Sequence, residues 1–219
     1  MKIQYLGHSC FRLISDMGTT VVCDPYNTDM VGLQMPAVRC DAVTVSHRHN
    51  DHDCMDNIIN NPAVLDCEVT CCADDIAIST LPTYHDGEKG AKRGGNLVFV
   101  FSIDGLKAVH MGDVGCLDDE LARKICGCDV LLLPVGGVYT VDAQGAKWYV
   151  DRINPKIVIP MHYGTDRHKF KLDGIDKFLS LFDKRQIDVY KRQLHTRMQS
   201  AKNALYVLQT FCEFCVGQT

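Results

Sequence analysis

The sequence predicts an α+β fold in which two sheets are sandwiched between helices, a four-layer αββα arrangement. Short β-rich runs bounded by turn residues dominate the first half of the chain, and strands alternate with helices in the second half. This order fits the four-layer arrangement, although other α+β arrangements also accommodate it. The 219 residues suit one domain, or one domain with a short appendage.

Strands are predicted where β-branched and aromatic residues cluster between turn residues. In the first half these runs cover residues 2–6, 10–14, 19–23, 42–45 and 64–70. In the second half they cover residues 77–83, 96–103, 106–110, 130–134 and 156–160.

Helices are predicted over residues 117–125, 142–153 and 173–182, and Asp118 and Asp142 lie at or near the starts of the first two. After about residue 188 the sequence changes character. It reads there as a basic, weakly amphipathic helix followed by a segment rich in Cys and Phe.

Composition argues against several classes of partner. The formal net charge is -4 and no basic stripe is present, so nucleic acid is not expected as a partner. No apolar run is long enough to cross a membrane, and the first residues lack the layout of a signal peptide, so a cytoplasmic location is expected.

The twelve cysteines are expected to be reduced and mostly to pack as small hydrophobes. The pairs Cys126/Cys128 and Cys212/Cys215 lack the further ligands of a structural zinc site.

The strongest local signal is a loop that follows the apolar run 41–45. It places His47, His49, Asp51 and His52 within six residues. Imidazole and carboxylate ligands suit zinc, with manganese or iron as alternatives. The H-x-H-x-D-H spacing predicts two adjacent metals, and the alternative is a polar, solvated loop.

This loop alone cannot complete two metal sites, so other strand ends are expected to supply further ligands. His85, Asp113 and His162 each follow an apolar run and come just before a glycine or a polar turn. These residues complete the predicted ligand set.

The same residues resemble metal-binding motifs of the metallo-β-lactamase superfamily, in matching order. The motifs are His47-x-His49-x-Asp51-His52, His85, Gly112-Asp113 and Pro160-Met161-His162-Tyr163. A narrower resemblance, to the lactonase-like branch that includes ascorbate-6-phosphate lactonase, rests also on Gly7-His8-Ser9-Cys10-Phe11, Cys23-Asp24-Pro25 and Leu133-Pro134-Val135-Gly136-Gly137. The resemblance covers about residues 1–185 and implies the metallo-β-lactamase fold.

The resemblance also implies roles for the seven residues. His47, His49 and His85 would hold one divalent metal ion, Asp51, His52 and His162 would hold a second, and Asp113 would bridge them. Two metals about 3.5–4 Å apart can share a hydroxide and polarise the substrate oxygen. Asp51 can also transfer a proton. The expected activity is hydrolysis of a small ester, lactone or phosphodiester, with a small molecule as substrate.

Other histidines and one aspartate are weaker candidates. His8 has either a catalytic role in the pocket or a buried structural role. Asp24 either orients a metal-bound imidazole or forms a turn before Pro25. His110 is expected to pack in the core, and His168 is expected to be exposed.

The segment 86–95, rich in glycine and cations, directly follows His85. It is expected either to form a mobile loop over the pocket or to be a solvated hairpin. In the first case Lys89, Lys92 and Arg93 are candidates to contact a phosphate or carboxylate of the substrate. Tyr163 is a further candidate for the pocket.

Competing functions are a nuclease of the same superfamily, a flavin-partnered di-iron protein and a metal-binding protein without activity. Known nucleases carry an added domain or arm that is not evident here, and the di-iron branch would replace His49 and lack His52. A homo-oligomer and the identity of the substrate are left open.

The resemblance ends near Ile187. Residues 1–187 are therefore expected to form the metallo-hydrolase domain. Residues 188–219 are expected to be an atypical tail that is not native to this fold.

Overall fold

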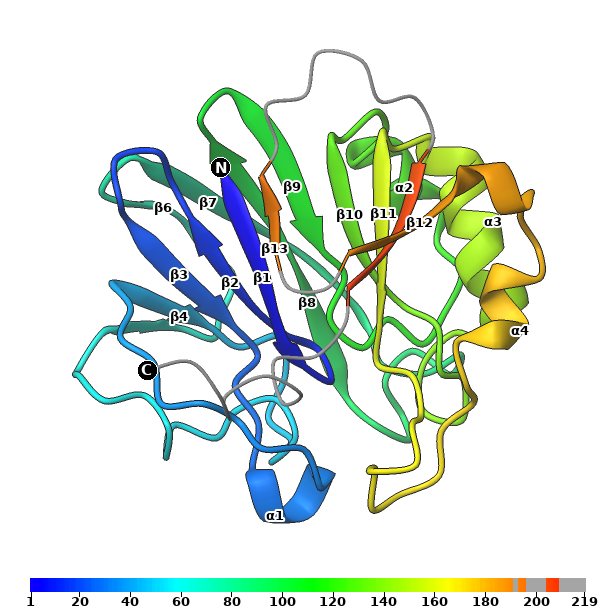
Figure 1. Ribbon diagram of the computed structural model, residues 1–219, viewed down its shortest axis with the longest axis horizontal. Helices are drawn as coiled ribbons and strands as arrows, with labels where there is room; N and C mark the ends of the chain where they lie inside the picture. The colour runs from blue at the N-terminus through cyan, green and yellow to red at the C-terminus, as the bar shows by residue number, and fades with distance from the viewer. Residues whose placement is uncertain (191–192, 196–203, 209–219) are drawn as a thin grey trace.

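The computed structural model describes residues 1–190, 193–195 and 204–208, and contains two mixed sheets that face each other (Figure 1). The six-stranded sheet has the order β13-β1-β2-β3-β4-β5. Its strands are β1 (Lys2–Gly7), β2 (Cys10–Ile14), β3 (Thr20–Cys23), β4 (Ala42–Thr44), β5 (Ala63–Leu65) and β13 (Gln193–His195).

The eight-stranded sheet has the order β12-β14-β11-β10-β9-β8-β7-β6. Its strands are β6 (Thr70–Ala73), β7 (Ile76–Tyr84), β8 (Gly95–Ile103), β9 (Leu106–His110), β10 (Val130–Pro134), β11 (Ile157–Met161), β12 (Ile187–Tyr190) and β14 (Ala204–Leu208). The strands β9, β10 and β11 run parallel to one another.

The main core lies between the sheets, because alternate residues of each strand point to the same face. Ile3, Phe11 and Leu13 of the first sheet and Phe99 and Phe101 of the second belong to one buried cluster. The central strand β10 is buried along its whole length, as expected for a parallel strand covered on both faces.

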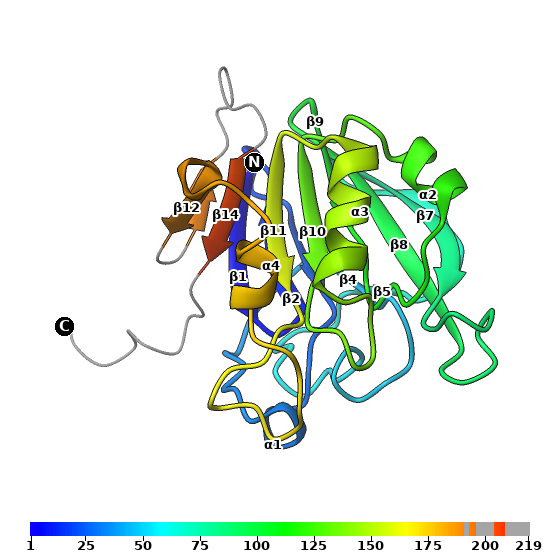
Figure 2. The ribbon, with the colours of Figure 1, turned by 90° about the vertical axis from the view of Figure 1, so that its right-hand side faces the viewer.

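Helices cover the outer face of the eight-stranded sheet (Figure 2). They are α2 (Asp119–Lys124), α3 (Ala143–Ile153) and α4 (Asp176–Leu179). The carboxylate of Asp118 accepts hydrogen bonds from two backbone N–H groups of α2, and that of Asp142 accepts one from α3, so both predicted helix starts are confirmed.

The outer face of the six-stranded sheet is covered mainly by irregular chain. The segments around residues 26–40 and 54–58 pack a third hydrophobic cluster there, with Tyr26, Leu33 and Met35 fully buried. The helix in this layer, α1 (Thr28–Val31), has four residues. The α+β sandwich class is therefore confirmed, with an outer layer on this side that is mostly loop.

Two predicted elements were wrong. The strand predicted over residues 64–70 is two short strands, β5 and β6, that belong to different sheets. The helix predicted over residues 173–182 is the four-residue α4. Its start is displaced because Gly174 forms a β-bridge with Gly164 and the Asp173 backbone N–H donates to Gly136 O.

The helix predicted after residue 188 is also wrong where the chain is described. A 3₁₀ helix, η1 (Lys184–Gln186), leads into β12, and β14 lies between β12 and β11 in the sheet. Leu205 of β14 is buried in the same cluster as α3. The remaining tail residues, including Cys212 and Cys215, lie outside the described residues, and the domain boundary at 187 stays a prediction.

Within the described part of the chain, no helix combines the length and the apolar character needed to cross a membrane.

Candidate metal centre

Strand ends from both sheets converge on one edge of the sandwich. The strands β3 and β4 are parallel, as are β9, β10 and β11, so their carboxyl ends lie on the same side. Polar residues follow these ends: Asp24 after β3, His47 after β4, His85 after β7, Asp113 after β9 and His162 after β11. Ligand sites commonly form at such an edge.

The loop after β4 turns tightly, so that its side chains gather. The backbone N–H groups of His52 and Asp53 both donate to His49 O, at 2.8 and 3.0 Å. His47 and His52 are buried, whereas His49 is exposed.

Three histidines form the first ligand group. Nitrogen atoms of His47, His49 and His85 lie within 4.8 Å of one another, which is close enough to share one ion. The structure thus brings together the three residues that the family resemblance assigns to the first metal.

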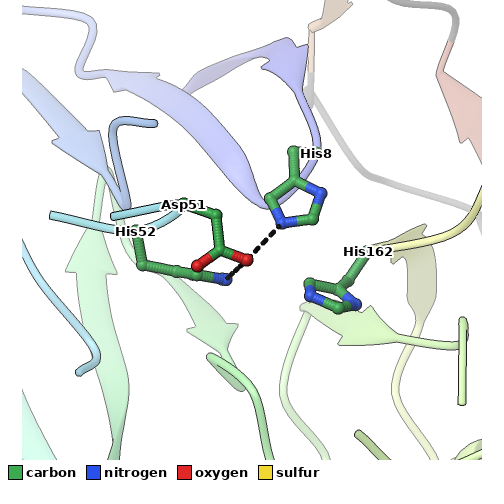
Figure 3. A group of neighbouring side chains, drawn as sticks. All are labelled: His8, Asp51, His52 and His162. Carbon is green, nitrogen blue, oxygen red and sulfur yellow. Dashed lines mark hydrogen bonds and ion pairs between the residues drawn. The ribbon is translucent and has the colours of Figure 1, made fainter. Parts of the chain in front are cut away.

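The second group contains Asp51, His52 and His162, together with His8 (Figure 3). His8 Nε2 lies 3.3 Å from Asp51 Oδ2, and His52 Nε2 lies 3.7 Å from the same oxygen. His8 is fully buried. The sequence placed His8 in the pocket as one of two alternatives, and the geometry adds it to the candidate ligands.

Asp113 lies between the two groups. Its Oδ2 is 3.1 Å from His162 Nε2 and 3.3 Å from His52 Nε2, on the side of the second group. It is 3.5 Å from His85 Nε2 and 3.9 Å from His47 Nε2, on the side of the first. One carboxylate oxygen therefore faces four imidazoles, two from each group. His8, His47, His49, Asp51, His52, His85, Asp113 and His162 are hereafter called the His/Asp cluster.

Several nitrogen and oxygen atoms of the cluster lack hydrogen-bond partners and are therefore available to bind metal ions. Buried polar side-chain atoms without a hydrogen-bond partner include Nε2 of His47, His52 and His162 and Oδ1 of Asp113. Such atoms are costly unless something binds them. Burial, with a smaller contribution from neighbouring histidines, lowers the pKa of His8 and His47 to about 3. Both imidazoles are therefore neutral at pH 7, the form that coordinates a metal.

Asp24 supports both groups from behind. Its Oδ2 lies 2.9 Å from His52 Nδ1 and accepts a hydrogen bond of 2.6 Å from the Ser46 hydroxyl. That hydroxyl also lies 2.9 Å from His47 Nδ1, and the Ser46 backbone N–H donates to Asp24 Oδ1. A carboxylate behind a ligating imidazole fixes the tautomer and the ring orientation. The sequence suggested this role for Asp24 but not the part of Ser46.

Three residues of the site have positive φ, which non-glycine residues seldom adopt. The values are 54° for His8, 45° for Asp24 and 51° for His162. Backbone strain of this kind costs about 1–3 kcal/mol and tends to occur where function requires it. Its presence at three positions of one cluster supports a functional site.

Asn96 and Gly112 position Asp113. The side chain of Asn96 accepts a hydrogen bond from the Asp113 backbone N–H at 2.8 Å and donates to Met111 O at 2.9 Å. A Cβ atom at Gly112 would overlap the Asn96 side chain and Ser46. No sequence signal identified Asn96, because it begins an ordinary alternating strand.

A pocket of about 620 Å³ opens above the cluster. Cluster residues at its floor include His49, Asp51, His85 and Asp113. Its other lining residues are Met30, Arg48, Asn50, Arg93, Tyr139, Lys169 and Phe170. The volume lies in the range of small-molecule sites, about 300–1,000 Å³.

The segment 86–95, hereafter called the Asp86 loop, is tied to its own first residue. The buried Asp86 carboxylate accepts four hydrogen bonds of 2.7–3.0 Å from the backbone N–H groups of Glu88, Gly90, Lys92 and Arg93. Such a network argues against the mobile loop considered from the sequence. Of its three cationic side chains, Arg93 lines the pocket, whereas Lys92 pairs with Glu88.

The structure places the three remaining candidates outside the ligand groups. His110 is fully buried, with its Nε2 2.8 Å from Ser9 O, as expected of a core histidine. Tyr163 is buried and packs in the cluster beneath the helices. His168 was expected to be exposed but is half-buried, and its ring centroid lies 5.6 Å from that of His8. The sequence could not place it, because His168 lies in an irregular loop.

Comparison with protein families agrees with this geometry. Residues 2–162 match the family described as Beta-lactamase superfamily domain. A UPF0173 metal-dependent hydrolase of Archaeoglobus fulgidus is 30% identical over 75% of this chain and 84% of that protein. Another, from Nanoarchaeum equitans, is 34% identical over 81% of this chain and 93% of that protein.

Solved structures show the same fold. A proposed Zn-dependent hydrolase of the metallo-beta-lactamase superfamily from Thermotoga maritima is 34% identical, with a TM-score of 0.79 over 95% of this chain and 98% of that chain. A metallo hydrolase from Ignicoccus hospitalis is 23% identical, with a TM-score of 0.60 over 74% of this chain and 82% of that chain.

Proposed function

The chain belongs to the metallo-β-lactamase superfamily, among the UPF0173 metal-dependent hydrolases, and we propose that it hydrolyses a small ester, lactone or phosphodiester with two divalent metal ions. The observation that carries this proposal is the position of Asp113 Oδ2, within 3.1–3.9 Å of four imidazoles that belong to two ligand groups. Zinc is proposed as the metal, because imidazole and carboxylate are its usual ligands, and manganese or iron suit the same set.

The ligands divide between the two groups. His47, His49 and His85 would hold one ion, Asp51, His52 and His162 would hold the other, and Asp113 would contact both. Two such ions would supply Lewis acidity and would activate a water for attack on the substrate.

The chain's own groups would move the proton. Asp51 lies at the pocket floor, and its neighbours His52 and His8 lower its pKa despite the opposing effect of burial. It is therefore ionised at neutral pH, and because the lowered pKa makes it a weak base, it would pass a proton on rather than keep it. His8 lies 3.3 Å from it and would hold that carboxylate in place.

Within the superfamily we place the chain in the lactonase-like branch, from the motifs around His8, Asp24 and Gly136. A small molecule is the proposed substrate, because the pocket has room for one and the chain has a net charge of -4, which disfavours RNA. The proposed location is the cytoplasm. It is supported by free thiols at exposed Cys67, Cys72 and Cys126, which a reducing compartment would maintain.

The proposal predicts about two metal equivalents per chain in purified protein, measured by elemental analysis. His49→Ala is expected to lower the metal content to about one equivalent and to reduce the hydrolysis rate at least about 100-fold, because an ion then loses one of its few ligands. His49 is exposed, so its loss should leave the fold intact. Activity is measured on a panel of lactones, thioesters and phosphodiesters.

The matched control is Asp53→Ala. Asp53 lies in the same loop but outside both ligand groups, so its variant should keep both metal content and rate. Full activity of His49→Ala would exclude the proposed mechanism. Turnover of lactones within the panel would support the lactonase-like assignment, and cleavage of phosphodiesters alone would contradict it.

A further inference from the structure

The wall of the pocket above the His/Asp cluster carries three cationic side chains, Arg48, Arg93 and Lys169. Arg48 forms an ion pair with Asp66. Among the described residues, neither Arg93 nor Lys169 has a carboxylate partner. Two of the three cationic residues that line the pocket are therefore not neutralised by a carboxylate, in a chain whose net charge is -4.

Arg93 is held in place by its surroundings. Its backbone N–H is one of the four that bind Asp86, and its Nη2 donates to Val138 O at 3.2 Å. The guanidinium lies 5.4 Å from the centroid of the Tyr139 ring. A guanidinium has five N–H donors, so this arrangement leaves others for a ligand, in a geometry that suits carboxylate or phosphate.

The carboxylates of the pocket do not cancel these cations. Asp51 and Asp113 are the acidic lining residues, and both are directed at imidazoles of the cluster. With divalent ions in the cluster, both carboxylates would be neutralised there. The positive charges of Arg93 and Lys169 would then add to those of the metal ions, and together they would concentrate anions in the pocket.

We propose that Arg93 and Lys169 form an anion subsite, which binds a carboxylate or phosphate group that is separate from the bond to be cleaved. Phe170, Tyr139 and Met30 line the same pocket and would contact an apolar part of the substrate. The substrate class is thus an ester or lactone with an anionic end group. This inference rests on the proposed function for the bond that is cleaved, but the binding of the anion can be tested separately.

The test compares two para-nitroanilides of equal acyl length, those of pentanoic acid and glutaric acid, which differ only in a terminal carboxylate. Their amide bond serves as a resistant mimic of the ester. Dissociation constants are measured by calorimetry on the metal-loaded protein. We expect the glutaric anilide to bind at least about tenfold more tightly, because charge-assisted hydrogen bonds contribute this much.

Arg93→Gln and Lys169→Gln are each expected to reduce that preference about tenfold. Lys92→Gln is the matched control, since Lys92 belongs to the same loop but pairs with Glu88 outside the pocket lining, and it should keep the preference. A phosphonate-ended anilide then shows which of the two anions binds more tightly. Absence of a preference in the unaltered protein, or equal preferences in Arg93→Gln and Lys92→Gln, would overturn the subsite.

The corresponding para-nitrophenyl esters separate the two proposals. If neither ester nor any substrate of the panel is cleaved while the anilide preference follows Arg93, the anion subsite stands and the hydrolase proposal fails. If both esters are cleaved at rates that do not depend on the end group or on Arg93, the hydrolase proposal stands and the anion subsite fails.

Discussion

Asp24 connects the two ligand groups through hydrogen bonds rather than through a metal. It binds His52 directly and reaches His47 through the Ser46 hydroxyl. Although burial opposes it, the nearby histidines keep the pKa of Asp24 below its usual value, so the carboxylate stays ionised. Its left-handed backbone places the side chain beneath the loop after β4. A single residue outside the ligand set therefore orients one imidazole of each group.

Asp24→Asn is expected to weaken metal binding by about 10- to 100-fold, the usual effect of losing a carboxylate behind a ligating imidazole. The amide keeps the size of the side chain but has an NH2 donor in place of one of the two acceptor oxygens. Chelator competition measures the change. Asp129→Asn serves as the control, because Asp129 binds Lys156 and the Lys107 backbone at the start of β10, away from the cluster. Equal metal affinities in the two variants would contradict the role of Asp24.

The candidate ligands could be located from the sequence because each is a polar residue at the end of an apolar run. His85, Asp113 and His162 are scattered along the chain, yet the structure brings them together with the loop after β4. Residues that act through hydrogen bonds carry no such signal. Asn96 and Lys169 entered the site only through the three-dimensional fold, because neither belongs to a recognisable motif.

At the scale of elements, the Asp86 loop depends on one carboxylate. Burial alone would raise the pKa of Asp86. The hydrogen bonds from four backbone N–H groups outweigh this effect and lower the pKa to about 2. Because the pKa of Asp86 is lower in the folded chain than in the unfolded chain, the ionised carboxylate stabilises the fold. This stabilisation is complete above the unfolded-state pKa of about 4 and is lost as the pH falls toward 2. The loop should therefore keep its structure at neutral and mildly acidic pH.

Asp86→Ala is expected to speed amide hydrogen exchange at residues 88–93 by about tenfold at pH 7, because four donors lose their acceptor. Exchange is followed by mass spectrometry of the peptides from this loop. Glu88→Gln removes only the surface pair with Lys92 and should leave exchange nearly unchanged. Unaltered protection in Asp86→Ala would show that the loop is held by other contacts.

The bounds of buried strands could be predicted from the sequence more closely than those of partly exposed strands. The strands β9 and β10 match their predicted ranges, because continuous apolar runs bounded by turns are distinctive. The edge strands β5 and β6 are partly exposed and show no such run, so the sequence joined them into one. Contacts with other segments also explain why α4 begins later than predicted. Asp173 and Gly174 form backbone hydrogen bonds with those segments and so do not begin a helix.

For the whole molecule, we propose that residues 1–187 form the metallo-hydrolase domain. The family match ends at residue 162, and all residues of the His/Asp cluster and the pocket lie before 187. The tail nevertheless adds β14 to the larger sheet, and Leu205 is buried there. We propose that these contacts affect stability rather than the chemistry of the site, and that the tail is not native to the fold.

A chain that ends at Ile187 is therefore expected to bind the same number of metal ions as the full chain but to melt at a lower temperature. Loss of Leu205 burial removes about 1.5–3 kcal/mol, which corresponds to roughly 3–12 °C in a domain of this size. Elemental analysis and thermal unfolding measure the two effects, and Leu205→Ala in the full chain should reproduce part of the melting shift. If the shortened chain is unfolded or binds no metal, the strands after residue 187 are an integral part of the domain, because the parallel pairing of β14 with β11 would then be needed to hold His162 at the end of β11.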